Sequence, residues 1–376
     1  MSVRLVAVLG VMAGCHFSAD FSNTSYRCDD GKCPAGYMCV ADTCVLPGGG
    51  DAGDAVTVDT IDADLALPWW NTSWGKRANL TITNGSQGEL LSGFPVGVSV
   101  DLGTLDSASA TANQLRVVRW DGVGWTELTR FDESTSAQDV FWFALVDGLA
   151  AGASTSEYWL YFDNPNAGMA QGTGSMVFPF FDGFVGTSVD TMKWAVQGTP
   201  TESNANLVLN PGDSVRTTSQ FKVGYALAAS LVATANAPRF WLGFQRQTDF
   251  TDGDPWILWI NRAANDSDAP PNANPATIWP ETYISSIGMN TPDWGPADTI
   301  DGTKHYYTIE RFADRIIYKY EENAVYTYTL PMTDSDELQV RLGNEGTKPI
   351  QFGTAFVRPV VIPDPTATIG ATQLQP

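Results

Sequence analysis

From residue 69 to the C-terminus, short runs of alternating apolar and polar residues recur, and they constrain the fold more than any other feature. Residues 78–83 and 94–101 are the clearest examples. Alternation with a period of two places apolar side chains on one face of a β-strand. No segment sustains a helical period, and 35 Gly and 22 Pro provide turns between the runs. We therefore expect an all-β protein built from many short strands.

The strand-like runs fall into two groups, separated by a small-residue joint at residues 171–176. Seven or so short strands in about 100 residues are typical of a β-sandwich, and a longer second group suits a jelly roll of two packed sheets. We expect two consecutive β-sandwich domains, at residues 69–170 and 171–376. The runs expected as strands are 78–83, 94–101, 115–120, 125–131, 140–145, 158–162, 207–209, 226–234, 239–246, 256–260, 305–311, 315–320, 324–330, 338–342 and 351–357.

The first fourteen residues have the pattern of an export signal. A single cation, Arg4, precedes an apolar run that ends in small residues before Cys15. The run is too short for a membrane span, which needs about 20 residues, and it fits the apolar region of a secretory signal. Residues 12–15, Met-Ala-Gly-Cys, resemble a bacterial lipobox, which implies lipidation of Cys15. The alternative is an ordinary signal peptide followed by a chance cysteine.

The other four cysteines lie within seventeen residues, in a segment that we assign to a disulfide-rich module at residues 15–46. An even, clustered set in an exported chain indicates a disulfide staple. Of three pairings we favour Cys28–Cys39 with Cys33–Cys44, because it closes the larger loops. Zinc binding is the alternative, although the spacings lack the usual Cys-x-x-Cys pairs. The segment resembles the short Cys-rich modules that follow lipoboxes in surface proteins.

The composition excludes some partners. Residues 47–68 carry five Asp and no cation, so we expect an extended linker. The whole chain has 42 Asp and Glu against 21 Lys and Arg, a net charge of -21. Nucleic acid needs clustered cations, so it is excluded as a partner. The expected location is the cell envelope, with the lipid anchor in the outer membrane or at the cell surface.

Two motifs frame the first predicted sandwich. Residues 74–101 contain Trp-Gly-Lys-Arg, then Leu-Thr-Ile-Thr-Asn, then Phe-Pro-Val-Gly-Val-Ser-Val-Asp, and residues 158–167 read Tyr-Trp-Leu-Tyr-Phe-Asp-Asn-Pro-Asn-Ala. Together they resemble the bacterial domain of unknown function 2341 over residues 69–170. The middle, at residues 113–122, departs from the pattern of that family. The resemblance implies an exported module and no activity.

The second predicted sandwich resembles concanavalin A-like lectin and glucanase domains. Residues 305–326, 351–371 and the opening at 180–194 carry this resemblance. It implies a fold and not a function, because the fold carries lectins, hydrolases and inert spacers.

No catalytic constellation is present in the sequence. Hydrolases of this fold place carboxylates on one strand as Glu-x-Asp-x-x-Glu, and no Glu here has an Asp two positions on. Glu310 and Asp314, and the adjacent Glu321 and Glu322, are expected to be solvated turn residues. No Gly-x-Ser-x-Gly elbow occurs, and His305 is expected to start a strand. We therefore expect a protein that is not an enzyme, with a divergent glycoside hydrolase as the least favoured alternative.

Aromatic residues are the candidate ligand-binding groups. Residues 261–300 form a long Pro-, Asn- and Asp-rich connection that carries Trp279, Tyr283 and Trp294. Aromatic faces can stack on sugar rings, and core packing is the alternative role for each residue. Trp256 and Trp259 lie three apart on one strand, so at most one faces outward. The leading hypothesis is a surface protein that binds extracellular glycan or polymer, and the alternative is a structural or adhesive envelope protein.

No cofactor is expected. Asp249, Asp252 and Asp254 offer oxygen ligands for Ca²⁺. A plain turn is the favoured interpretation of these three residues.

Overall fold

The structure is a computed structural model that describes two compact units. The units are Met1–Pro68 and Trp69–Pro376. Described are residues 26–27, 38–40, 43–45 and 67–376, except 102–104, 106–113, 135–138, 169, 171, 235–238, 247–249, 251–253, 263–268, 271–272, 275 and 290. Between residues 26 and 45, and at 134 and 139, the description is of the backbone alone.

The prediction of an all-β protein is confirmed. Within the described ranges the regular elements are strands and two 3₁₀ turns, Gly174–Met176 and Ser285–Ile287. No helix in that part of the chain is long and apolar enough to cross a membrane.

The first unit contains a small antiparallel sheet. Its strands are ordered β1 (Tyr26–Arg27), β3 (Thr43–Val45) and β2 (Met38–Val40). In the β2–β3 register Cys39 lies opposite Cys44. The predicted anchor Cys15, Cys28, Cys33 and linker residues 47–66 lie outside the described residues, so lipidation and the disulfide pairing stay predictions.

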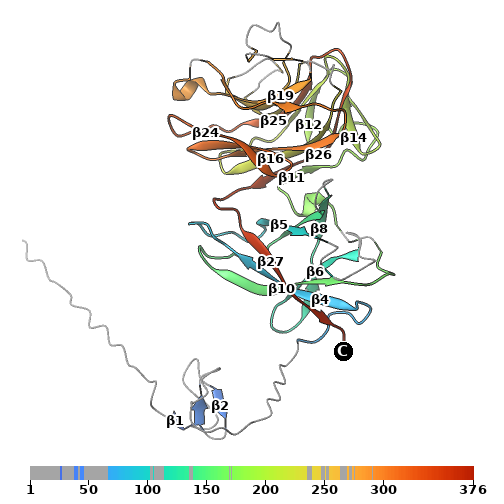
Figure 1. Cartoon of the computed structure of the whole chain (residues 1–376), viewed down its shortest axis with the longest axis vertical. Helices are drawn as coiled ribbons and strands as arrows, with labels where there is room; N and C mark the ends of the chain where they lie inside the picture. The colour runs from blue at the N-terminus through green and yellow to red at the C-terminus, as the bar shows by residue number, and fades with distance from the viewer. Residues whose placement is uncertain are drawn as a thin grey trace, which may run out of the picture. The chain divides into compact units, whose positions relative to one another are not determined.

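The first sandwich, in the second unit, has a five-stranded sheet facing a three-stranded one (Figure 1). The larger sheet has the order β27 (Thr366–Leu374), β4 (Lys76–Thr83), β10 (Ser154–Phe162), β6 (Arg116–Trp120) and β7 (Trp125–Glu127). The smaller one has the order β5 (Pro95–Val100), β9 (Asp139–Ala144) and β8 (Arg130–Ser134).

The alternating residues of these strands form the core of the first sandwich. Ala78, Leu80 and Ile82 of β4 are fully buried, and they share one cluster with Val96 and Val98 of β5. The predicted run 125–131 is divided between β7, which pairs with β6, and β8, which pairs with β9. The chain therefore changes sheets inside a run that the sequence presents as continuous.

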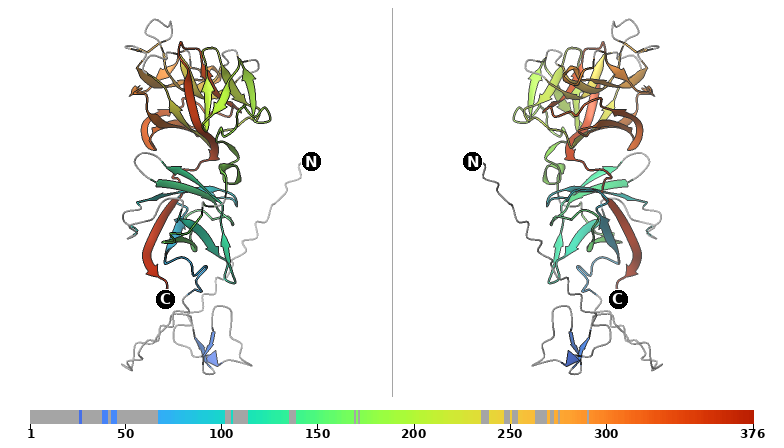
Figure 2. Two further views of the ribbon diagram at one scale, coloured as in Figure 1. Left: turned by 90° about the vertical axis from the view of Figure 1, so that its right-hand side faces the viewer. Right: turned by 90° about the vertical axis from the view of Figure 1, so that its left-hand side faces the viewer.

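The last strand of the chain belongs to the first sandwich. β27 pairs antiparallel with β4, from Thr366 opposite Thr83 to Leu374 opposite Lys76. In Figures 1 and 2 this red strand runs along the edge of the first sandwich. The predicted range 171–376 placed these residues in the second sandwich, whereas the sheet pairing places them in the first. The reason is that partner strands far apart in sequence leave no local signal.

The second sandwich has two eight-stranded sheets. The first has the order β13 (Thr201–Ser203), β14 (Asn206–Leu209), β26 (Ile350–Pro359), β16 (Tyr225–Val232), β22 (Lys304–Arg311), β23 (Arg315–Tyr320) and β24 (Asn323–Thr329), with β11 (Phe180–Asp182) beside β26. The second has the order β12 (Trp194–Gln197), β15 (Ser214–Thr217), β25 (Gln339–Asn344), β17 (Phe240–Gln245), β18 (Trp256–Ile260), β19 (Thr277–Tyr283) and β20 (Asp293–Trp294), with β21 (Asp298–Thr299) beside β19.

One apolar cluster fills the space between these two sheets. It includes Phe240, Leu242 and Phe244 of β17 and Ile309 of β22, all 0% exposed. The predicted strands of this region are confirmed, with ends that agree to within two residues. The connection expected at 261–300 is different, since it contains β19, β20 and β21. Thr277–Tyr283 forms a strand because β18 offers it a partner edge.

A smaller aromatic cluster joins the two sandwiches. Trp142 of β9 packs with Phe178, which precedes β11, and with Ala228 and Phe356 of the second sandwich. The Phe178 and Phe356 rings are stacked with centroids 4.1 Å apart. Apolar area removed from water at this cluster stabilises the contact between the sandwiches.

Candidate functional site

The candidate site lies on the outer face of the second sheet of the second sandwich, the face that points away from the core. Side chains alternate between the two faces of a strand. In β17, Phe240, Leu242 and Phe244 enter the core, so Trp241 and Gln245 lie on the outer face. In β18, Trp259 is in the core and its indole N–H donates to the Thr308 carbonyl at 3.2 Å.

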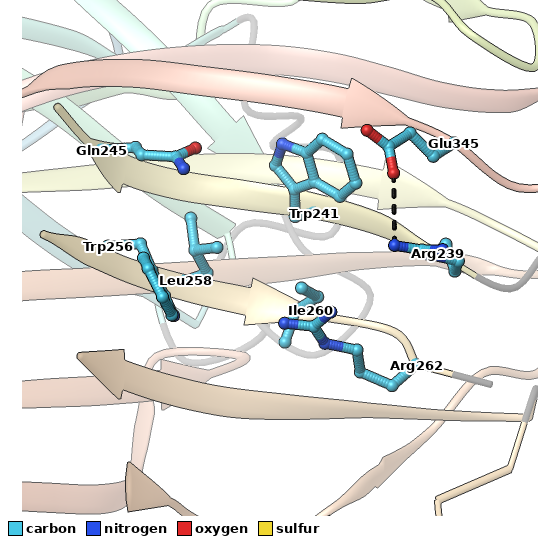
Figure 3. Close-up of a pocket in the computed structure, with 8 residues that line it drawn as sticks. All are labelled: Arg239, Trp241, Gln245, Trp256, Leu258, Ile260, Arg262 and Glu345. Atoms are coloured by element: carbon cyan, nitrogen blue, oxygen red, sulfur yellow. Dashed lines mark ion pairs between the residues drawn. The ribbon is translucent and has the colours of Figure 1, made fainter. Parts of the chain in front are cut away.

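The outer-face side chains surround a pocket that is open to solvent (Figure 3). Leu258 and Ile260 form an apolar floor, and Trp241 lies beside them. One end of the pocket carries the charged residues Arg239, Arg262 and Glu345, and the other end carries Gln245 and Trp256. The lining residues are Arg239, Trp241, Gln245, Trp256, Leu258, Ile260, Arg262 and Glu345.

Trp241 is fixed in place with an unused hydrogen-bond donor. It is 5% exposed, and a Cβ on Gly343 of the next strand would lie 2.5 Å from its ring. A glycine is therefore required at that position for the indole to lie flat on the sheet. The indole Nε1 is buried and has no hydrogen-bond partner. A buried unpaired donor costs about 1–3 kcal/mol, so an acceptor at this point would be favourable.

A buried arginine supports this ring from beneath. The Arg341 guanidinium lies 4.5 Å from the centroid of the Trp241 ring. Arg341 is 2% exposed and donates to Gln245 Oε1 and to Ser214 Oγ, at 3.1 Å in both cases. These bonds hold Gln245 and Trp241 in fixed positions at the pocket.

Glu281 of β19 is a buried carboxylate on this face. It is 0% exposed and lies opposite Leu258 in the register. The Trp256 indole N–H donates to Glu281 Oε1 at 2.8 Å, and Arg262 Nη2 contacts its two oxygens at 3.4 and 3.3 Å. Glu281 thus orients both Trp256 and Arg262 toward the pocket.

An exposed ion pair closes the charged end of the pocket. Arg239 Nη2 lies 3.5 Å from Glu345 Oε2, and both side chains are nearly half exposed. The Arg239 backbone has a φ of 70°, which is unusual for a residue other than glycine. Asn261 Oδ1 accepts from the Arg239 N–H at 2.9 Å, and the Arg239 carbonyl accepts from the Glu345 N–H at 2.7 Å. These bonds hold the strained backbone.

The three aromatic residues predicted from the sequence lie on this same face. Trp279 is opposite Ile260, Tyr283 is opposite Trp256, and Trp294 is opposite Glu281. The Tyr283 and Trp256 rings pack with centroids 4.4 Å apart. All three predicted residues are half-buried. They border the pocket-lining residues, and their role in binding stays a prediction.

Trp241 and Trp256, which line the pocket, were not predicted as ligand groups. In Phe-Trp-Leu-Gly-Phe every position is apolar, so the alternation that separates core from surface is hidden. The expectation that only one of Trp256 and Trp259 faces outward is met by the structure.

The calcium candidates are only partly described. Asp249 and Asp252 lie outside the described residues. Asp254 Oδ1 accepts from the Ser285 N–H at 3.0 Å, at the start of a 3₁₀ turn. The described residues include no group of three or more His, Cys, Asp or Glu side chains that could hold a metal ion.

The carboxylates expected in turns differ in environment. Glu310 is 4% exposed, and its Oε1 lies 2.6 Å from Lys319 Nζ and 3.0 Å from Arg358 Nη2. The expectation of a solvated Glu310 is wrong, because the strand-paired neighbours place two cations over it. Asp314 is exposed and pairs with Arg315.

Glu321 and Glu322 form the turn before β24, with φ of 47° and 63°. They are half-buried, and Glu321 Oε1 lies 3.1 Å from His305 Nδ1. His305 is the second residue of β22.

A second aromatic group lies on the first sandwich. The Trp120 and Trp125 rings, on paired strands, have centroids 5.0 Å apart, and both residues are half-buried. Trp125 also packs edge-on against Trp159 and Tyr161. These rings pack on each other and line no pocket described here. Because they are tryptophans outside the candidate site, they serve as controls in binding experiments.

Comparison with known families gives one match. The family model described as a domain of unknown function, DUF2341, matches residues 113–197. The match includes the closing motif at 158–167 and begins after the opening motif at 74–101. It covers less than half of the chain. No curated protein matches.

Several solved structures resemble about half of the chain. An endo-acting O-glycanase from the human gut microbiota is 12% identical with a TM-score of 0.36, covering 49% of this chain and 99% of that chain. A pseudo beta-1,3-glucanase of Mycobacterium tuberculosis is 14% identical with a TM-score of 0.37, covering 49% and 99%. A laminarinase from Flavobacterium sp. UMI-01 is 13% identical with a TM-score of 0.37, covering 48% and 99%. Because every TM-score lies below 0.5, these likenesses carry no inference about function.

Proposed function

We propose that this protein binds an extracellular glycan, without cleaving it, through the pocket on the outer face of the second sandwich. The observation that carries the proposal is the indole N–H of Trp241, a pocket-lining residue, which is buried without a hydrogen-bond partner. A sugar presents apolar C–H faces and hydroxyl acceptors together. The pocket offers matching groups for both.

The aromatic side chains supply the stacking surface. Trp256 is held by its hydrogen bond to Glu281 and by its packing on Tyr283, so its ring is ordered before a ligand arrives. Rigid aromatic side chains lose little entropy on binding. Trp279 and Trp294 extend the aromatic surface beyond the pocket on the same face.

The carboxylates of this face favour binding over hydrolysis. Glycoside hydrolases use two carboxyl groups, roughly 5–10 Å apart, on either side of the scissile bond. At the pocket Glu345 is paired with Arg239, and on the strands of this sheet, within the described residues, Glu281 is the single carboxylate on the outer face. Its oxygens accept from Trp256 and Arg262, which suits a positioning role.

A glycan array followed by calorimetry with the full-length chain tests the proposal. The Trp256→Ala and Trp241→Phe variants should weaken binding, the first by removing the ring and the second by removing the N–H donor together with part of the indole ring. Trp120→Phe on the first sandwich is the matched control and should bind like wild type. An array without hits, or Trp241 and Trp256 variants equal to wild type, would exclude this site.

We also propose that the chain is exported and anchored in the bacterial cell envelope through a lipidated Cys15. The sequence of residues 1–15 supports this. Replacing Cys15 with Ala should abolish labelling of the protein by a fatty-acid probe in cells. Label that persists in this variant would contradict the proposal.

A further inference from the structure

We infer that the β23–β24 hairpin is a pH-responsive element whose turn is held in place by the charged form of His305. Neither the turn nor His305 contributes to the lining of the pocket at the candidate site. The inference combines two observations. The backbone of the turn is one that its own residues do not favour, and the side-chain bonds that hold it depend on a histidine.

The turn that joins the two strands consists of Glu321 and Glu322 alone. Tyr320 lies opposite Asn323 in the register, so the loop has two residues. Both residues have a positive φ, 47° and 63°. Two-residue hairpin loops with this backbone favour Asn-Gly, because the left-handed region is unfavourable for most residues that carry a Cβ. Side-chain contacts are therefore needed to offset the backbone strain of this turn.

Both glutamates of the turn are held by residues of β22. Glu321 Oε1 accepts from the Tyr306 N–H and faces His305 Nδ1, at 3.1 Å in both cases. Glu322 Oε1 accepts from Thr308 Oγ1 at 3.1 Å. Among these three partners, the histidine is the one whose side chain ordinarily changes its charge between about pH 5 and 8. The hold on Glu321 therefore depends on pH.

His305 faces a carboxylate from each of its two ring nitrogens. Nδ1 lies 3.1 Å from Glu321 Oε1, and Nε2 lies 3.0 Å from Asp301 Oδ1. Hydrogen bonds from Thr303, and then from His305, lower the pKa of Asp301 to about 2. The imidazolium has a proton on both nitrogens and donates to both carboxylates, whereas the neutral ring donates only once. The charged ring therefore bridges the loop before β22 and the turn after β23.

A second arrangement is available when the ring is neutral. Tyr320 Oη lies 2.6 Å from His305 Nδ1. Burial, and then the charges of Asp298, Glu321 and Asp301, raise the pKa of Tyr320 to about 12, so the hydroxyl keeps its proton. It can donate to Nδ1 once that nitrogen has lost its own proton. Glu321 then loses the donor that faces it. The turn is thus held at lower pH and released as the pH rises.

Other titratable groups lie around the histidine and the turn, namely Lys304, Tyr307 and Asp298 near His305, and Glu133 across the junction of the sandwiches. Tyr307 Oη donates to Asp298 Oδ2 at 3.3 Å, and burial raises the pKa of both groups. Burial, and then the charge of Glu322, raise the pKa of Glu133 to about 8. Ionisation of Glu133 is therefore a second source of pH dependence at this turn, which the experiment must remove.

Hydrogen–deuterium exchange of the full-length chain tests the inference, read by mass spectrometry on peptides that cover the turn. All samples carry Glu133→Gln, because glutamine cannot ionise. We expect amide protection in the turn, corrected for the intrinsic exchange rate, to fall about tenfold between about pH 5 and about pH 8. This is the effect of losing one hydrogen bond to a charged group.

Two variants and a matched control locate the effect. His305→Gln cannot carry the charge and should show low protection at both pH values. Glu321→Asn combined with Glu322→Gly supplies the residues that this turn favours, so the turn should stay protected at both pH values. His16→Gln removes the other histidine of the chain and should behave like the background.

Three outcomes would overturn the inference. The first is equal protection of the turn at the two pH values in the background. The second is a fall in protection that persists unchanged in His305→Gln. The third is a fall that persists unchanged when the turn is Asn-Gly, and it decides the matter even where His305→Gln does not fold.

Discussion

The Glu133 carboxyl, buried beside the junction of the two sandwiches, should make the stability of the chain depend on pH. It is 2% exposed, and the Trp142 indole N–H donates to its Oε2 at 2.6 Å. Burial, and then the charge of Glu322, raise the pKa of Glu133 to about 8. The bond from Trp142 and the charges of Arg358 and Lys304 act in the opposite direction and are outweighed.

The sign of the effect follows from the two pKa values. An unfolded Glu has a pKa near 4.3, so in the window up to about pH 8 the folded state holds a proton that the unfolded state has released. The stability that Glu133 contributes is fully present below its pKa in the unfolded state. It is lost as the pH rises to and through its pKa in the folded state. At 1.36 kcal/mol for each pH unit, the loss across the window is on the order of 5 kcal/mol.

Glu133→Gln keeps the shape of the protonated side chain and cannot ionise. Denaturant unfolding at about pH 5 and about pH 8.5 should show that wild type loses several kcal/mol more than the variant between these two values. Glu337→Gln, an exposed residue, is the matched control and should follow wild type. If wild type and Glu133→Gln have the same pH dependence, the carboxyl is not kept protonated and the reasoning fails.

Three further changes test the packing. A chain that ends at Pro365 lacks β27, so the edge of β4 loses its partner, and we expect a lower melting temperature and faster proteolysis within the first sandwich. Asp334→Asn removes the charge that faces Arg311, whose side chain is 0% exposed, and should cost about 3–5 kcal/mol in denaturant unfolding. Phe356→Ala empties the stacked position opposite Phe178 and should cost about 3–5 kcal/mol by the same measurement, whereas a cost below about 1 kcal/mol would show that the aromatic cluster is not packed in solution.

Most strands were predictable because their signal is local. Runs such as 305–311 and 315–320 alternate cleanly, and the structure places strands at 304–311 and 315–320. What could not be predicted depends on partners distant in sequence. β27 exists because β4 offers it an edge, and β19 because β18 does.

The candidate site was predictable only at its border. Trp279, Tyr283 and Trp294 drew attention because they interrupt a polar, Pro-rich segment, and they do lie on the outer face. Trp241 lies in a run that is apolar throughout, so the sequence does not reveal which side it faces. Its environment depends on Gly343, which lies under the ring from a strand about a hundred residues later.

The chain crosses from the first sandwich to the second after β10 and crosses back after β26. One cluster of side chains contacts both crossings. Phe178 lies on the first crossing and stacks on Phe356. Asp364 lies on the second crossing, where it accepts from Arg358 at 3.0 Å, and the Arg358 guanidinium lies 5.0 Å from the centroid of the Trp142 ring. Since both crossings meet the same buried side chains, rotation of one sandwich against the other would expose the cluster and break the ion pair. The second sandwich is inserted into the first, between β10 and β27, so two chain segments and a common core hold the sandwiches together.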